Sequence, residues 1–86
     1  MYTIYYTNNA QKDAKKIKNN NLKSKIEKLL SIIRINPWES YPPYEKLIGD
    51  LQGCYSRRIN IQHRLVYEVN EDKKVIKILK MWTHYE

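Results

Sequence analysis

The sequence predicts an α+β domain: an N-terminal strand, an antiparallel two-helix hairpin, and then antiparallel strands that form one sheet. Two observations predict this fold. Apolar residues recur at helical spacing between residues 8 and 33, and short runs of β-branched and aromatic residues lie before and after that region. A chain of 86 residues has room for one modest core. Residues 1–86 are therefore expected to form a single domain.

The first predicted element is a strand over residues 2–6, where every residue is aromatic or β-branched. The turn-forming residues Thr7-Asn8-Asn9 end it, and the same polar side chains can cap a helix. Ala10, Ala14 and Ile17 then follow at helical spacing, with lysines on the other face. They predict a first helix over about residues 8–18.

A second helix follows and is expected to run antiparallel to the first. Its apolar positions give the clearest periodic signal in the chain: Leu22, Ile26, Leu29, Leu30 and Ile33. The pair Asn36-Pro37 ends it, because a residue that precedes proline avoids the helical conformation. The apolar stripe of this helical hairpin requires a sheet to cover it.

Residues 37–53 contain all three prolines and both glycines, and predict a loop with one helical turn around Tyr44–Ile48. The residues after Gly53 are again rich in β-branched and aromatic side chains. They predict strands over Tyr55–Ile61, Arg64–Val69 and Val75–Trp82. The order βααβββ then gives an antiparallel sheet with the helical hairpin on one face.

The charge of the chain points to a polyanionic partner. Sixteen Lys and Arg residues against nine Asp and Glu residues give a net charge of +7. On so small a body this charge attracts polyanions, so that nucleic acid, the ribosome and an acidic protein are the first candidates.

The same composition indicates a cytoplasmic protein with no membrane association. The single Cys54 cannot form an internal disulfide, and no secretion signal opens the chain. No apolar run approaches the roughly 20 residues that a membrane-spanning helix needs.

Three stretches carry a family resemblance. They are Pro43–Leu47 with Leu51-Gln52-Gly53, then Tyr55-Ser56-Arg57-Arg58-Ile59 with His63-Arg64-Leu65-Val66-Tyr67, and finally Thr83-His84-Tyr85. In order and spacing they resemble the YoeB branch of the RelE superfamily of bacterial toxins. The Ser-Arg-Arg-Ile and His-Arg-Leu-Val-Tyr run is the specific part of the match.

The resemblance implies an activity and a set of site residues. Members of that family cut messenger RNA in the A site of the 70S ribosome, without metal or cofactor, and a YefM-type antitoxin silences them. By resemblance Glu45 is the general base, Arg64 lies at the scissile phosphate, and His84 and Tyr85 form a catalytic pair. Arg58 matches an arginine that holds phosphate and RNA.

Two positions depart from the family pattern. Members commonly end at the His-Tyr pair, whereas Glu86 follows it here. A lysine often stands where this chain has Ile48, so that Lys46 is the nearest cation for the RNA phosphate.

Elementary chemistry agrees with these assignments. Metal-free RNA cleavage needs a base for the 2′-OH, a cation for the charge that develops on phosphorus, and an acid for the leaving 5′-oxygen. Glu45, Arg64 and His84 supply one of each, and an imidazole with a pKa of about 6.5 can be protonated beside a phosphate. The products would be a 2′,3′-cyclic phosphate and a 5′-hydroxyl, and DNA would be resistant.

Each residue also has a simpler interpretation. Glu45 can be a solvated loop carboxylate, Arg64 can pair with an acid in a strand, and His84 can be a surface residue near the C-terminus. Arg57 and Arg58 alternate across a strand, so only one readily faces RNA, and Arg58 is our choice.

Other residues are expected to be structural or remain open. His63 belongs to the motif but is expected to be structural. The lysines at 12–18 form either a solvated helix face or a contact to ribosomal RNA.

Two other functions remain open. The chain can be a protein-binding toxin of ParE type, which inhibits gyrase, or an RNA-binding module without catalysis; neither needs the set of Glu45, Arg64, His84 and Tyr85. Nor does the sequence exclude a nuclease that works without ribosomes. The basic surface predicts an acidic, partly disordered antitoxin, and a homodimer is plausible.

Overall fold

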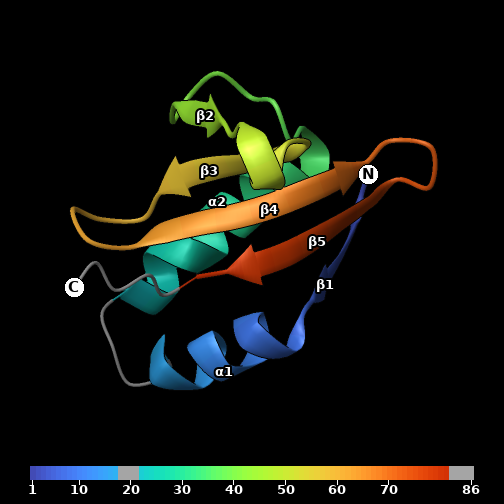
Figure 1. Cartoon of the computed structure of the whole chain (residues 1–86). Helices are drawn as coiled ribbons and strands as arrows, with labels where there is room; N and C mark the ends of the chain where they lie inside the picture. The colour runs from blue at the N-terminus through green and yellow to red at the C-terminus, as the bar shows by residue number, and fades with distance from the viewer. Residues whose placement is uncertain (18–21, 82–86) are drawn as a thin grey trace.

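The computed structural model describes residues 1–17 and 22–81, without the side chain of Leu51. The elements in chain order are β1 (Thr3–Tyr6), α1 (Asn8–Ile17), α2 (Leu22–Ile35), β2 (Tyr44–Lys46), a 3₁₀ turn η1 (Gly49–Leu51), β3 (Cys54–Arg58), β4 (Arg64–Asn70) and β5 (Val75–Lys80). Figure 1 shows the strands in one twisted sheet with the helices to one side and below. The predicted α+β class is confirmed.

The sheet has the strand order β1-β5-β4-β3-β2. The three strands predicted after the helices, β3–β5, pair antiparallel as expected, and the unpredicted β2 also pairs antiparallel, but β1 pairs in parallel with β5. The expectation of a wholly antiparallel sheet was therefore wrong for β1. β1 pairs with the edge of β5 that the meander of β2–β5 does not use, and the helices carry the chain from β1 at one edge of the sheet to β2 at the other.

The predicted helical turn around Tyr44–Ile48 was also wrong, because Tyr44–Lys46 forms the edge strand β2. Its residues pair with Arg57, Ser56 and Tyr55 of β3, and this pairing satisfies the backbone N–H and C=O groups of β2. No local pattern in the sequence predicts the pairing. The helical turn lies slightly later, at η1.

The predicted strand Tyr55–Ile61 ends earlier, at Arg58. A local turn ends it, since Asn60 Oδ1 accepts hydrogen bonds from the backbone N–H groups of Gln62 and His63 at 2.8 and 2.7 Å. The last predicted strand ends at Lys80, and Trp82 lies outside the described residues.

Helix α1 is fixed by a cap at its start and by a buried carboxylate near its middle. Thr7 caps it, accepting a hydrogen bond from Ala10 N at 3.1 Å, as the polar residues after β1 led us to expect. The Asp13 carboxylate is buried and accepts a hydrogen bond from Met81 N at 3.0 Å. An acid on this helix therefore ties α1 to the end of β5.

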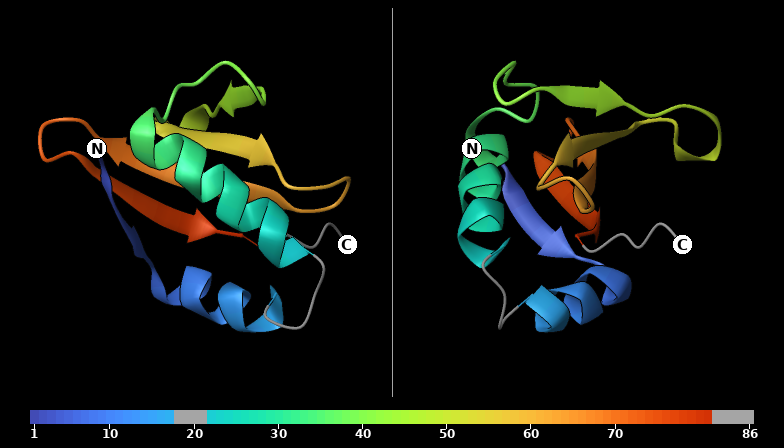
Figure 2. Two further views of the ribbon diagram at one scale, coloured as in Figure 1. Left: turned by 180° about the vertical axis from the view of Figure 1, so that it is seen from behind. Right: turned by 90° about the vertical axis from the view of Figure 1, so that its left-hand side faces the viewer.

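Helix α2 crosses one face of the sheet, as the reverse view in Figure 2 shows. Of the predicted stripe, Leu22, Ile26, Leu29 and Ile33 are buried, and they join one core with the inward-facing residues of the sheet. Leu30, the fifth residue of the stripe, is partly buried and packs against the same core. Within the described residues, neither helix has the length and apolar character needed to cross a membrane. In the part of the chain that the structure describes, no helix covers the opposite face of the sheet, so polar side chains there can be reached from outside.

Candidate active site

The alternation of side chains along three strands brings the predicted residues together. Glu45 of β2 lies opposite Ser56 of β3, and Arg58 of β3 lies opposite Arg64 of β4. Ser56 and Arg58 are two residues apart in one strand and so point to the same face. Tyr55, the residue before Ser56, points to the other face and packs against the core. All four polar residues therefore lie on the face away from α2.

Glu45 and Arg64 form an ion pair across this face. Glu45 Oε2 lies 3.4 Å from Arg64 Nη1, and the Arg64 guanidinium also donates to Ser56 Oγ at 3.5 Å. The Glu45 side chain is 67% exposed, whereas that of Arg64 is 25% exposed. The carboxylate is thus open to an incoming molecule while the arginine is held against the sheet.

A hollow of about 310 Å³ adjoins the pair, and we call it the β2–β3 hollow. It is lined by Pro42, Pro43, Tyr44, Glu45, Ser56, Arg58 and Arg64. Sequence reasoning missed Ser56 and the two prolines as part of this site. Strand alternation from Arg58 could have placed Ser56 there, but nothing local indicated that the prolines fold over the same face.

The hollow has a net positive charge from its lining. Arg58 and Arg64 lie directly opposite each other in neighbouring strands, an arrangement of like charges that destabilises a sheet. Glu45 is the one acid among the lining residues. The two arginines are unfavourable for stability in this arrangement, but together they are suited to holding an anion such as a phosphate diester.

Arg57 and Arg58 point to opposite faces, as predicted. Arg57 is completely buried, whereas Arg58 is exposed and lines the β2–β3 hollow. Of the two, only Arg58 can reach a ligand in that hollow, and its contact with RNA stays a prediction.

The remaining candidates are placed differently. Lys46 lies opposite Tyr55, so alternation turns it toward the other face, and it does not line the hollow. His63 is buried in the turn between β3 and β4, in keeping with the structural role expected of it. His84 and Tyr85 lie outside the described residues. The structure thus brings together Glu45, Arg58 and Arg64.

Cys54 is not a nucleophile candidate, although it lies on the same strand. Burial, helped by the nearby Glu68 carboxylate, raises the pKa of the Cys54 thiol. The thiolate, which is the reactive form, is therefore disfavoured at neutral pH. Among residues 1–17 and 22–81, no three His, Cys, Asp or Glu side chains gather as they would around a metal ion.

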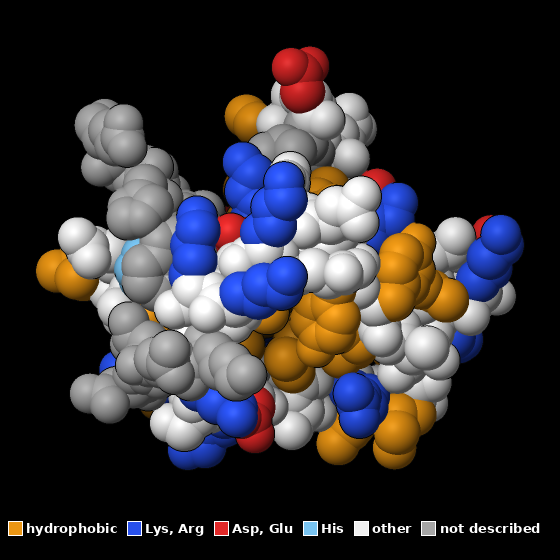
Figure 3. Space-filling view, turned by 90° about the horizontal axis from the view of Figure 1, so that it is seen from below, with side chains coloured by type: hydrophobic (Ala, Val, Ile, Leu, Met, Phe, Trp, Pro, Cys, Tyr) orange, Lys and Arg blue, Asp and Glu red, His pale blue; other side chains and the backbone are white. Residues whose placement is uncertain are grey.

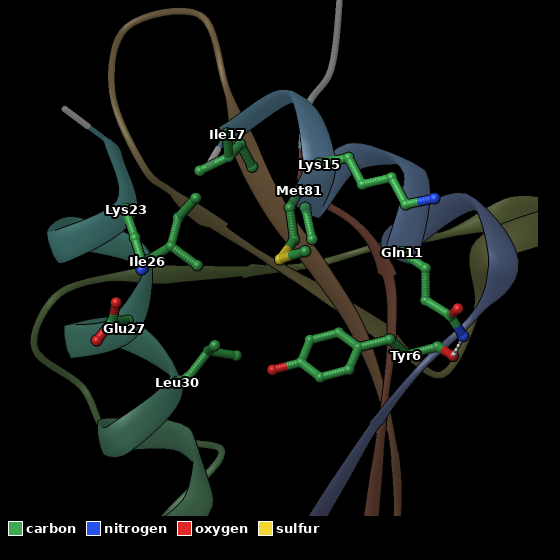
Figure 4. Close-up of a pocket in the computed structure, with 10 residues that line it drawn as sticks. Tyr6, Gln11, Lys15, Ile17, Lys23, Ile26, Glu27, Leu30 and Met81 are labelled. Carbon is green, nitrogen blue, oxygen red and sulfur yellow. Dashed lines mark hydrogen bonds between the residues drawn. The ribbon is translucent and has the colours of Figure 1, made fainter. Parts of the chain in front are cut away.

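A second hollow lies between the two helices, and we call it the interhelical groove. It encloses about 420 Å³, and its residues include Tyr6, Ile17, Ile26, Leu30 and Met81. Figure 4 shows the Tyr6 ring and these apolar side chains pointing into it, with Lys15, Lys23 and Glu27 around them. Figure 3 shows basic side chains spread around an apolar patch on the underside of the molecule. The groove is therefore suited to binding apolar side chains of a partner.

Comparisons with known proteins agree with this fold. Residues 4–85 match the family model described as the YoeB-like toxin of bacterial type II toxin–antitoxin systems. The chain is 38% identical over 61 residues to Toxin YoeB of Mycobacterium bovis, covering 71% of this chain and 69% of the relative.

Solved structures from Staphylococcus aureus are similar over nearly the whole chain. The YoeB–YefM complex matches with a TM-score of 0.84 and 40% identity over 99% of both chains. The YoeB dimer matches with a TM-score of 0.83 and 39% identity over 98% of both chains.

Fold, charge and comparisons together define a toxin of a bacterial type II toxin–antitoxin system. Within that class, the chain belongs to the YoeB-like family, a branch of the RelE superfamily, as its three motifs predicted.

Proposed function

We propose that this toxin is an endoribonuclease that acts in the ribosomal A site and cuts messenger RNA by attack of a 2′-OH on the adjacent phosphate, without a metal ion. The observation that carries the proposal is the Glu45–Arg64 pair, 3.4 Å apart beside the basic β2–β3 hollow. A carboxylate and an arginine in contact are the base and the cation that this reaction needs side by side.

Each residue has a defined part in the reaction. Glu45 takes the proton from the 2′-OH, and Arg64, with Arg58, stabilises the charge that builds on phosphorus. His84 protonates the leaving 5′-oxygen, and Tyr85 stacks on a base or donates a hydrogen bond. Lys46 contacts the RNA backbone outside the hollow. The bond from phosphorus to the 5′-oxygen breaks as the bond from phosphorus to the 2′-oxygen forms.

The ion pair of the free protein also suggests how the base is released. A phosphate that enters the hollow competes with Glu45 for the Arg64 guanidinium. Once Arg64 turns to the phosphate, the carboxylate is free to accept a proton. An exposed pair of this kind is held by only about 0–1 kcal/mol, so the exchange costs little.

The openness of the site favours a ribosome-dependent reaction. The Glu45 side chain is 67% exposed, so the toxin itself encloses little of a substrate around this proposed general base. Alignment of the 2′-OH and the phosphate must then come largely from elsewhere, and a messenger fixed in the A site is already aligned.

The proposed partners follow from the charge and the relatives. The net charge of +7 suits ribosomal RNA and an acidic, YefM-like antitoxin. The interhelical groove, apolar within and bordered by Lys15 and Lys23, offers this antitoxin a place for apolar side chains beside acidic ones. A homodimer is also proposed, because a relative from Staphylococcus aureus was solved as a YoeB dimer.

The test is cleavage of messenger on programmed ribosomes, with 5′ ends mapped by primer extension. We expect a cut in the A-site codon with the parent protein, and a loss of about 10² to 10⁴ in rate with Glu45→Gln. Glu71→Gln, in the exposed turn before β5, is the matched control and should cut like the parent.

The other outcomes identify the rival functions. Intact messenger with the parent protein, while ribosomes still translate, would favour a gyrase-binding toxin of ParE type. Inhibited translation that Glu45→Gln does not relieve would favour an RNA-binding module without catalysis.

A further inference from the structure

A buried arginine lies in β3 opposite Tyr44, the residue before the proposed base. Arg57 sits between Ser56 and Arg58 in β3 but points into the protein, where its exposure is 0%. A buried guanidinium is costly unless its N–H groups are hydrogen-bonded. Its placement therefore depends on a specific set of acceptors.

All the hydrogen-bond acceptors of the Arg57 guanidinium are uncharged groups. Arg57 Nε donates to the Tyr67 hydroxyl at 2.9 Å, Nη1 donates to Pro42 O, and Nη2 donates to Pro37 O and Glu39 O at 3.1 and 2.8 Å. Three of these acceptors are backbone carbonyls of the segment between α2 and β2. One side chain thus holds most of the length of this segment.

Tyr67 of β4 completes the arrangement from the centre of the sheet. Its hydroxyl accepts the bond from Arg57 and donates to Pro37 O at 2.8 Å. Burial raises the pKa of the Tyr67 phenol in spite of the nearby Arg57, so the hydroxyl keeps the proton that it donates. We call these two side chains the Arg57–Tyr67 clamp.

The held segment leads straight into the proposed base. Pro42, whose carbonyl accepts from Arg57, is three residues before Glu45. The ring of Tyr44, the residue next to Glu45, lies over the Arg57 guanidinium with its centroid 5.0 Å away. The clamp therefore contacts the chain at two points just before Glu45.

Besides the clamp, Glu45 is held through β3, since the neighbouring Tyr44 ring packs against Tyr55 and Leu47 N donates to Cys54 O at 3.0 Å. Its strand β2 has three residues, lies at the edge of the sheet and pairs with β3 alone. Its own side chain is largely exposed and bound through one ion pair.

We propose that the Arg57–Tyr67 clamp positions Glu45 against Arg64, so that Arg57 and Tyr67 are positioning residues for RNA cleavage. This inference rests on the proposed ribonuclease function. Neither side chain of the clamp lines the β2–β3 hollow, and the clamp acts through two residues that do, Pro42 and Tyr44, by seating β2 on β3. A displacement of about 1 Å at a reacting group can lower a rate by about 10²-fold.

The test is Tyr67→Phe, which removes the bridging hydroxyl and keeps the ring. In steady-state cleavage of messenger on programmed ribosomes, we expect kcat to fall about 10- to 100-fold with KM unchanged. Tyr55→Phe is the matched control, because Tyr55 packs against the Tyr67 ring in the same aromatic cluster and, among the described residues, its hydroxyl makes no hydrogen bond to the segment. It should cleave like the parent.

Two further measurements separate positioning from general stability. In a Glu45→Gln background, Tyr67→Phe should lower the residual rate no further, because there is no base left to position. Amide hydrogen exchange over residues 44–46 should be faster in Tyr67→Phe while exchange in β4 and β5 stays unchanged.

The contrary results are distinct from a failure of the proposed function. A Tyr67→Phe protein with the parent's kcat, beside an inactive Glu45→Gln, would overturn the clamp and leave the ribonuclease standing. The same fold loss in both backgrounds, or unchanged exchange over residues 44–46, would also overturn it. A parent protein that cuts no messenger would overturn both.

Discussion

Glu45 and Arg64 contact each other at 3.4 Å although their strands, β2 and β4, are not neighbours in the sheet. The two side chains meet over β3, at Ser56, whose small side chain is buried beneath them. The proposed base and cation are therefore brought together by the middle strand, and a small residue at position 56 leaves room for their contact.

The size of residue 56 is the first testable feature. Ser56→Leu should separate Glu45 from Arg64 and lower cleavage about 10²-fold, because a longer side chain would stand between them. Ser56→Ala keeps the space and removes one hydrogen bond at 3.5 Å, so it should cleave almost normally. Equal activity of the two variants in single-turnover cleavage would contradict this account of the contact.

The opposed arginines give a prediction about stability and salt. Arg58→Gln relieves the repulsion with Arg64, so urea denaturation should show an unfolding free energy that is higher by a few tenths of a kcal/mol. The same variant should bind RNA more weakly, with the slope of log K against log salt reduced by about 0.7 for one lost phosphate contact. An unchanged salt slope would remove Arg58 from the RNA contacts.

The buried thiol gives a prediction about alkaline pH. Burial raises the pKa of Cys54 in the folded protein, so above the thiol's ordinary pKa the unfolded chain binds fewer protons than the folded one. Its contribution to stability is complete below that pKa and is lost as pH rises through the folded value. Denaturation at pH 8 and pH 10 should show a loss of stability that is smaller in Cys54→Ala. An identical loss in both proteins would contradict it.

The buried carboxylate of α1 is expected to serve stability alone. Asp13→Ala leaves Met81 N without its acceptor in a buried place and should lower the unfolding free energy by about 1–3 kcal/mol. Lys12→Ala, at the exposed neighbouring position, should have little effect. Cleavage per folded molecule should be the same in both variants, and a selective loss of activity in Asp13→Ala would place this residue in function.

Local patterns in the sequence predicted the helices well. The spacing of Leu22, Ile26, Leu29 and Ile33 predicted both α2 and its buried face, because the buried face of an amphipathic helix is visible in the sequence as apolar residues at helical spacing. The strand β2 was missed because its three residues, which follow two prolines, are too few to show the alternation of apolar and polar residues that predicts a strand. It exists through pairing with β3, which no local window contains.

The site was likewise predictable only in part. The motifs predicted Glu45, Arg58 and Arg64, and strand alternation predicted that Arg57 and Arg58 point to opposite faces of the sheet. That Arg57 would be wholly buried could not be predicted, because its acceptors are the carbonyls of residues 37, 39 and 42, which come from a segment with no regular structure. The parallel pairing of β1 likewise depends on an edge that forms only when β5 is in place.

The most direct test of the central claim uses the substrate. A messenger that carries a single 2′-deoxynucleotide on the 5′ side of the cut is compared on programmed ribosomes with the same messenger made wholly of ribonucleotides. The proposed mechanism predicts that the all-ribose messenger is cut and leaves a 5′-hydroxyl, while the deoxy-substituted one stays intact. Cleavage of the deoxy-substituted messenger at the same bond, or a product with a 5′-phosphate, would contradict attack by the 2′-OH.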